Sequence, residues 1–168
     1  LSLICYCVDK SLYYNLIFKF IGLLDLSTLK KYDPSGMHEI YDRWPEIARQ
    51  SYDSQNNVVD FHGIDHIVFA GMGGSGAIGD IFSSILSKSK IHISVVKGYH
   101  LPQTVDSNTL VVAASISGNT IETLTILDSA KKLNCNIIAF SSGGKMKDYC
   151  IKNDIEFRQI QQLHSPRT

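Results

Sequence analysis

The sequence predicts an α/β protein, a three-layer αβα sandwich around a five-stranded parallel sheet with the flavodoxin-like strand order 2-1-3-4-5. From Ile64 onward, short apolar runs alternate with segments of helical pattern. The apolar runs are nearly continuous, which is typical of strands covered by helices on both faces. Parallel strands joined through helices need right-handed crossovers, and open sheets of this kind bind ligands where the strand order reverses.

Three segments are expected along the 168 residues. Residues 1–31 form an atypical apolar segment, which we interpret as a docking helix or a reading-frame artefact, since it falls short of the ~20 apolar residues of a membrane span. A turn-rich break at Lys30–Met37 leads into residues 32–60, which hold a one-sided helical pattern at Met37–Tyr52 that Pro45 could divide, and a polar linker. Residues 61–168 form the main domain.

The main domain is expected to alternate strands and helices. The predicted strands are His66–Ala70, Ile91–Val96, Thr109–Ala114, Asn136–Phe140 and Ile155–Arg158, and the predicted helices are Ser75–Leu86, Thr120–Leu133 and Lys145–Asn153.

Composition excludes several classes of protein. Lys plus Arg equals Asp plus Glu at 16 each, so there is no electrostatic case for nucleic acid or an anionic membrane. The four cysteines and six histidines lack metal-ligand spacing, so we expect no metal and no cofactor. Without a dense disulfide pattern the cysteines are interpreted as reduced, which favours a cytoplasmic protein.

Three strand ends run into turns rich in glycine and serine. Gly71–Gly76 follows the first strand, Ser115–Thr120 the third, and Ser141–Gly144 the fourth. Backbone N–H groups at a helix N-terminus favour negative charge, and glycine lets a ligand approach the chain. These loops therefore predict an anionic, hydroxyl-rich ligand such as a sugar phosphate.

Two other interpretations stay open. Gly71, Gly73 and Gly76 satisfy the dinucleotide pattern G-x-G-x-x-G, although the second strand ends without the acidic residue that binds the ribose, and only Lys97 could meet a 2′-phosphate. An NADP-binding Rossmann half is therefore an alternative. Asn119 and Glu122 resemble a helix capping box, and we assign Glu122 to that cap.

The loops resemble those of the sugar isomerase (SIS) domain family. Gly-Met-Gly-Gly-Ser-Gly at 71–76, Ser-Gly-Asn-Thr-Ile-Glu-Thr-Leu at 117–124 and Ser-Ser-Gly-Gly at 141–144 are similar in particular to bifunctional phosphoglucose/phosphomannose isomerases. The resemblance extends to Tyr32–Met37 and Lys97–Pro102 and covers about residues 32–168.

This resemblance implies a domain that binds glucose, mannose or fructose 6-phosphate and takes part in aldose–ketose isomerisation through an enediolate, without a metal. Arg167 would be catalytic and steady the enediolate charge. The implied substrate-binding residues are Gly73, Gly74, Ser75, Ser115, Ser117, Gly118, Asn119, Thr120, Ser141 and Ser142.

Two departures from the family matter. Ile116 occupies a position where many relatives carry an aromatic residue, and the glutamate, histidine and lysine of the reaction would come from a second SIS domain after Thr168. No residue here is a convincing general base, so we expect binding without turnover by this chain alone. A binding-only sensing module is an alternative, and a homodimer is expected.

Overall fold

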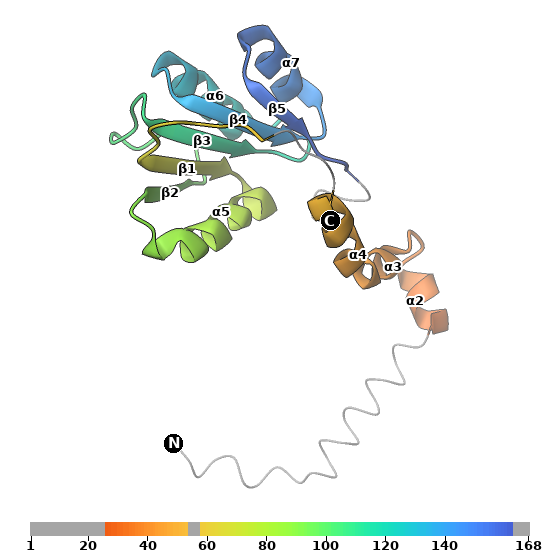
Figure 1. Ribbon diagram of the computed structural model, residues 1–168. Helices are drawn as coiled ribbons and strands as arrows, with labels where there is room; N and C mark the ends of the chain where they lie inside the picture. The colour runs from red at the N-terminus through yellow and green to blue at the C-terminus, as the bar shows by residue number, and fades with distance from the viewer. Residues whose placement is uncertain (1–25, 54–57, 163–168) are drawn as a thin grey trace, which may run out of the picture. The chain divides into compact units, whose positions relative to one another are not determined.

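The computed structural model describes residues 26–53 and 58–162 (Figure 1). The chain divides into two compact units, Leu1–Gln55 and Asn56–Thr168, and each is described by itself. The segment boundaries predicted after residues 31 and 60 remain predictions. The apolar stretch before Leu26 and the predicted catalytic Arg167 lie outside the described residues.

Three short helices make up the described part of the first unit: α2 (Leu26–Tyr32), α3 (Met37–Asp42) and α4 (Trp44–Asp53). The helical pattern is therefore confirmed as two helices that divide at Arg43, the C-terminal cap of α3. Pro45 lies in the first turn of α4, where its missing N–H group is not needed for the helix.

The break between α2 and α3 is shorter than predicted, because Lys30 and Lys31 still belong to α2. Asp33 fixes the turn: its carboxylate accepts a 2.8 Å hydrogen bond from the backbone N–H of His38 and lies 2.8 Å from His38 Nδ1. These contacts, the backbone hydrogen bond first, lower the pKa of Asp33 to about 2.

The second unit contains a five-stranded parallel sheet with the order β2-β1-β3-β4-β5, as predicted. Every predicted strand is confirmed to within one residue at each end. The strands are β1 (His66–Gly71), β2 (His92–Val96), β3 (Thr109–Ala114), β4 (Asn136–Ser141) and β5 (Glu156–Gln159).

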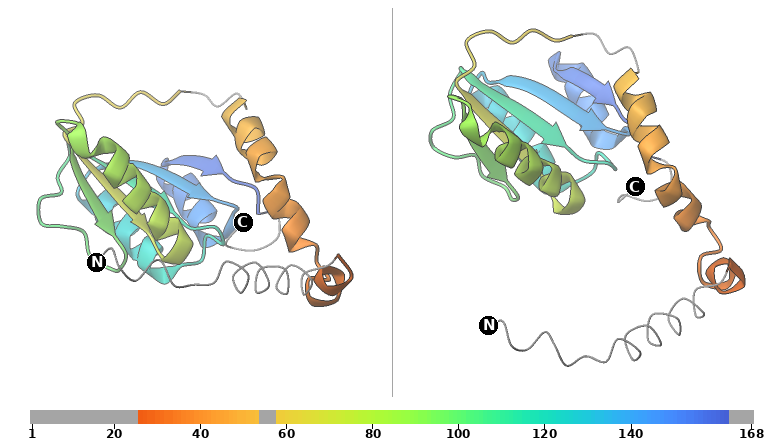
Figure 2. Two further views of the ribbon diagram at one scale, coloured as in Figure 1. Left: turned by 90° about the horizontal axis from the view of Figure 1, so that it is seen from below. Right: turned by 60° about the horizontal axis from the view of Figure 1, so that its bottom comes forward.

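Helices cover the sheet on both faces (Figures 1 and 2). Helix α5 (Gly73–Ile85), followed by the 3-10 turn η1 (Leu86–Lys88), packs on β1 and β2. Helices α6 (Ile121–Lys132) and α7 (Gly144–Asn153) lie on the opposite face, where α6 contacts β1, β3 and β4 and α7 contacts β4 and β5. The helix bounds agree with the predicted ones to within two residues.

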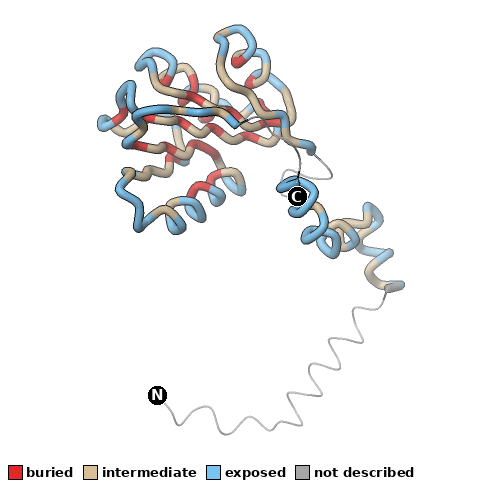
Figure 3. Tube along the Cα trace, viewed as in Figure 1, coloured by how far each residue is buried: buried red, intermediate tan, exposed pale blue. Residues whose placement is uncertain are grey.

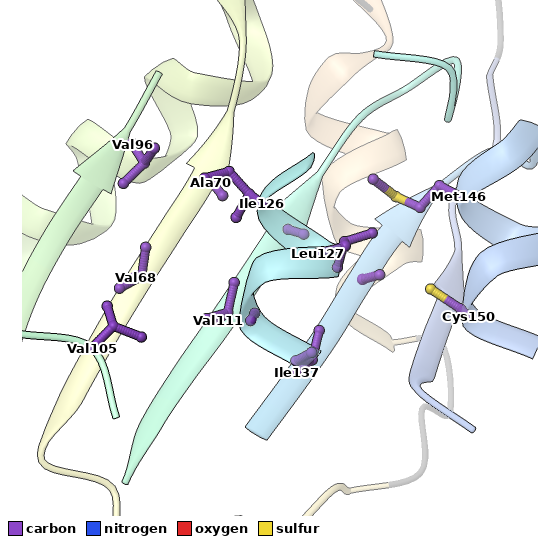
Figure 4. Close-up of a cluster of buried hydrophobic side chains, with 13 residues drawn as sticks. Val68, Ala70, Val96, Val105, Val111, Ile126, Leu127, Ile137, Met146 and Cys150 are labelled. Carbon is purple, nitrogen blue, oxygen red and sulfur yellow. The ribbon is translucent and has the colours of Figure 1, made fainter. Parts of the chain in front are cut away.

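The core lies between the sheet and the pair α6 and α7 (Figures 3 and 4). Side chains from both layers there are without solvent exposure: Val68, Val111, Ala113, Ile126, Leu127, Ala130, Ala139, Met146 and Cys150. On the other face, Leu110, Val112, Ile138 and Phe140 are only half-buried. The apolar strand sequences predicted helices on both faces, which is confirmed, but the two faces of the sheet are buried to different extents.

Replacing Leu127 with alanine is expected to lower the free energy of unfolding by about 3 kcal/mol, because the fully buried side chain leaves a cavity in the core. Ile121 lies on the same helix and is 67% exposed, so Ile121→Ala is the matched control and should change stability by under about 0.5 kcal/mol. Urea unfolding measures both. Equal losses in the two variants would contradict the assignment of α6 to the core.

A buried histidine lies at the amino end of β1. His66 is 4% exposed, its Nε2 atom lies 2.9 Å from Ser94 Oγ, and its ring centroid lies 4.5 Å from that of His92. Burial and then the charge of His92 lower the pKa of His66, while the Thr104 carbonyl, Asp106 and Asp65 act in the opposite direction.

The folded protein should therefore lose stability in acid. The unfolded chain takes up the His66 proton near pH 6.5, above the pKa in the folded state, so the contribution of neutral His66 is complete above pH 6.5 and is lost as the pH falls below it. We expect His66→Gln to flatten the dependence of unfolding free energy on pH between 5 and 6.5. The control is His62→Gln at an exposed position. An unchanged slope in His66→Gln would show that another group titrates.

Candidate functional site

Three loops leave the sheet at neighbouring positions on its carboxyl edge. Gly71 of β1 pairs with Ala114 of β3, which pairs with Phe140 of β4. The predicted serine- and glycine-rich loops after these three strands therefore begin side by side, as the strand order requires. We refer to residues 115–120 as the hydroxyl loop and to residues 141–145 as the clamp loop.

The glycines after β1 serve two purposes. A Cβ atom on Gly79 would lie 2.8 Å from Phe69 Cβ, and one on Gly76 would lie 2.6 Å from the Gly71 carbonyl oxygen, so both allow close packing. Gly73 and Gly74 are exposed, and a Cβ atom on either would have no atom within 4 Å. The turn at Gly73, Gly74 and Ser75 thus borders open space at the start of α5.

Hydroxyl groups gather in the hydroxyl loop. Ser115 is 2% exposed, its Oγ lies 2.8 Å from Thr120 Oγ1, and it accepts a 3.2 Å hydrogen bond from the Gly118 N–H. Thr120 is the N-cap of α6 and makes no side-chain hydrogen bond to the helix. The N–H groups of the first turn of α6 therefore lack a side-chain cap, which is the arrangement that binds anions at helix N-termini.

The predicted capping box is wrong. Asn119 precedes the N-cap, and its side chain bonds outside α6: Oδ1 accepts the Lys145 N–H at 3.2 Å, and Nδ2 donates to the Ser117 carbonyl at 3.1 Å. The carboxylate of Glu122 instead raises the pKa of the Tyr99 hydroxyl through its charge and a hydrogen bond.

The clamp loop binds the hydroxyl loop directly. Ser142 donates to the Ile116 carbonyl twice, from Oγ at 2.6 Å and from its N–H at 3.0 Å. The Met146 N–H donates to the Gly118 carbonyl at 2.9 Å. Ser141 is fully buried, and its Oγ donates to the Gly143 carbonyl at 2.9 Å. The structure therefore brings the residues predicted after β3 and β4 into one cluster.

Glycine makes this contact between the loops possible. Gly118 has a φ of +67°, and a Cβ atom on it would lie only 1.8 Å from the Gly143 carbonyl oxygen. Gly144 has a φ of +66°, and a Cβ atom there would lie 2.5 Å from the Ser117 carbonyl oxygen. Both positions exclude a side chain through space and through backbone conformation.

Lys97 does not provide a free cation for a nucleotide phosphate. Its Nζ lies 2.5 Å from Asp80 Oδ2, and its side chain passes over Gly76, where a Cβ atom would lie 3.1 Å from Lys97 Cε. The residue that could have met the 2′-phosphate of NADP is therefore already paired with a carboxylate.

A cavity of about 440 Å³ lies at the other end of the strands, away from these loops. Residues from the amino ends of β4 and β5 line it together with the end of α6, and they include Lys131, Asn136, Asp154 and Glu156. The cavity carries charges of both signs and none of the serine loops, so we assign the site to the carboxyl edge.

Within residues 26–53 and 58–162, no group of three or more His, Cys, Asp or Glu side chains is placed to hold a metal ion. None of the helices in the same residues has the length and apolar character needed to cross a bilayer.

The structure is thus a doubly wound α/β domain whose serine loops meet beside an uncapped helix N-terminus, an arrangement that suits an anionic ligand. The SIS domain model matches residues 60–150, and the chain belongs to the SIS family.

The chain spans about two-fifths of the length of two curated relatives that it matches. It is 38% identical over 135 residues to a bifunctional phosphoglucose/phosphomannose isomerase of Caldicellulosiruptor bescii, which is 78% of this chain and 40% of that protein. It is 34% identical over 132 residues to a D-glucosamine-6-phosphate 4-epimerase of Sulfolobus acidocaldarius, covering 78% and 41%.

The fold is also found in a solved structure, the NanR protein of Vibrio vulnificus complexed with ManNAc-6P. The TM-score is 0.51 at 18% identity, over 62% of this chain and 41% of that one. At this level of identity the likeness concerns the fold.

Gly118→Ala should separate the two loops, because the new methyl group would overlap the Gly143 carbonyl and the residue would keep a positive φ. We expect the free energy of unfolding to fall by about 2 kcal/mol or more in urea unfolding. Gly98→Ala is the control, since its Cβ atom would meet nothing within 4 Å. A Gly118→Ala variant as stable as Gly98→Ala would contradict the close contact of the loops.

Proposed function

We propose that this SIS domain binds a hexose 6-phosphate, with glucose, mannose and fructose 6-phosphate as the candidate ligands. The phosphate would lie at the start of α6 against Ser115, Ser117, Gly118 and Thr120. The hydroxyl cluster at the uncapped N-terminus of α6 carries this proposal, since hydroxyl and N–H donors there suit a phosphate dianion. The sugar would lie against Gly73, Gly74 and Ser75, which border open space.

The reaction that we propose for the protein is aldose–ketose isomerisation, in line with its similarity to phosphoglucose/phosphomannose isomerases. The step moves a proton between carbons one and two through an enediolate, and Arg167 is the proposed electrostatic stabiliser of that charge. A general base must lie within hydrogen-bond reach of the proton, and we assign none in this chain. We therefore propose that the chain alone binds the ligand without isomerising it.

We further propose a cytoplasmic homodimer. Cys135 and Cys150 are unpaired, which suits a reducing compartment. Self-association is supported by a stripe on α5 in which Ile78, Ile81, Phe82 and Ile85 recur at helical spacing and stay 43–67% exposed.

Calorimetric titration of the 168-residue chain should detect fructose 6-phosphate and no binding of fructose. Ser115→Ala and Thr120→Val should each weaken fructose 6-phosphate binding by roughly 10-fold or more, because each removes a hydroxyl donor to a charged group. Thr125→Val is the control, since the Thr125 hydroxyl donates to the Ile121 carbonyl within α6.

Three outcomes would contradict parts of this proposal. Equal binding of fructose would exclude the phosphate as the recognised group. Binding of NADPH in place of the sugar phosphate would favour a nucleotide site. Interconversion of fructose 6-phosphate and glucose 6-phosphate by the purified chain would show that it carries its own base, and would exclude a sensing module that only binds.

A further inference from the structure

We propose that Ser142 and Asn119 are positioning residues: they hold the backbone of the hydroxyl loop so that the hydroxyl groups of Ser115 and Thr120 face the phosphate at the start of α6. This inference rests on the proposed function. It gives the two side chains a different role from the direct ligand contact that the family resemblance implied.

Three consecutive carbonyl groups of the hydroxyl loop are each bound. The Ile116 carbonyl accepts from Ser142, the Ser117 carbonyl accepts from Asn119 Nδ2, and the Gly118 carbonyl accepts from the Met146 N–H. Two of the three donors, Ser142 and Met146, belong to the polypeptide that follows β4. The third, Asn119, is itself held to that segment through the Lys145 N–H.

Fixing these carbonyls also fixes the N–H groups that follow them. A trans peptide is planar, and its C=O and N–H point in opposite directions. Holding the carbonyls of residues 116–118 therefore fixes the direction of the N–H groups of residues 117–119. Two of these N–H groups bond within the loop: Gly118 donates to the Ser115 carbonyl at 3.0 Å and to Ser115 Oγ at 3.2 Å, and Asn119 donates to Ser117 Oγ at 3.3 Å. The Gly118 N–H therefore holds the buried Ser115 hydroxyl in place, 2.8 Å from Thr120 Oγ1 at the start of α6.

Both serine hydroxyl groups of the clamp loop already donate their protons to backbone carbonyl groups. Ser142 Oγ donates to Ile116 at 2.6 Å. Ser141 Oγ donates to the Gly143 carbonyl and accepts the Gly143 N–H at 3.1 Å, and this residue is fully buried. The hydroxyl groups of Ser141 and Ser142 thus shape the loop contact, while those of Ser115 and Thr120 bond to each other at the start of α6.

The test compares Ser142→Ala with Ser142→Thr in the 168-residue chain. Ser142→Ala removes the shorter of the two bonds to the Ile116 carbonyl, and Ser142→Thr keeps the hydroxyl. We expect affinity for fructose 6-phosphate and for inorganic phosphate to fall about 5- to 10-fold in Ser142→Ala and to stay within about twofold in Ser142→Thr. Ser129→Ala is the matched control, because its hydroxyl donates to Thr125 within α6.

The deciding measurement needs no ligand. In ligand-free protein, Ser142→Ala should shift the amide resonances of Ser117, Gly118 and Asn119 and speed their hydrogen exchange, and Asn119→Ala should do the same for Ser117 and Gly118. A serine that only contacts the phosphate would leave these amides unchanged.

The two hypotheses fail differently. If the wild-type chain binds fructose 6-phosphate while the loop amides of free Ser142→Ala match those of wild type, the positioning role is overturned and the proposed function stands. If the wild-type chain binds neither fructose 6-phosphate nor phosphate, the proposed function is overturned, and the anion-directed role falls with it.

Discussion

The contact between two backbone segments at the carboxyl edge of the sheet is the constraint on which the candidate site depends. Residues 115–120 and 141–145 approach so closely that Gly118 and Gly144 leave no room for a Cβ atom. This contact lets carbonyl groups of one loop accept hydrogen bonds from the other before any ligand arrives. Because the donors are already held in place, an anion would not have to supply the energy that orders them.

The strand order creates that contact. Strands β3 and β4 are neighbours and parallel, so the loops after them leave the sheet at the same edge, and β1 brings its glycine turn to the next position. Helix α6 is held against the sheet by Ile126, Leu127 and Ala130, which are fully buried. Its N-terminus therefore has a fixed direction, and the partial positive charge there adds to the hydroxyl donors of Ser115 and Thr120.

Local sequence was sufficient to predict the strands, their order and the positions of the loops, because near-continuous apolar runs and serine–glycine turns are short-range signals. Local sequence was insufficient to predict which groups are hydrogen-bonded to each other. Asn119 matched a capping box, but its amide oxygen accepts from Lys145, which is 26 residues away along the chain. Unequal burial was also unpredictable: Leu110 and Val111 are alike in sequence, yet only Val111 lies beneath α6 and is fully buried. Site roles that depend on residues 163–168, Arg167 above all, remain predictions.

A site of this kind separates recognition of the phosphate from the choice of reaction. Backbone N–H groups and the small hydroxyls of Ser115 and Thr120 can bind a phosphate whatever the configuration of the attached sugar. The names of two relatives fit a phosphate site that is shared by different reactions: one is named as an isomerase and the other as an epimerase of phosphorylated hexoses. Stereochemistry and proton transfer need groups near the sugar carbons, and the glycine turn after β1 offers no side chain at Gly73 or Gly74 for either task. If the domain binds a hexose phosphate as proposed, Ser75 is the side chain of that turn that would lie against the sugar, and the choice of reaction would need further groups near the sugar carbons.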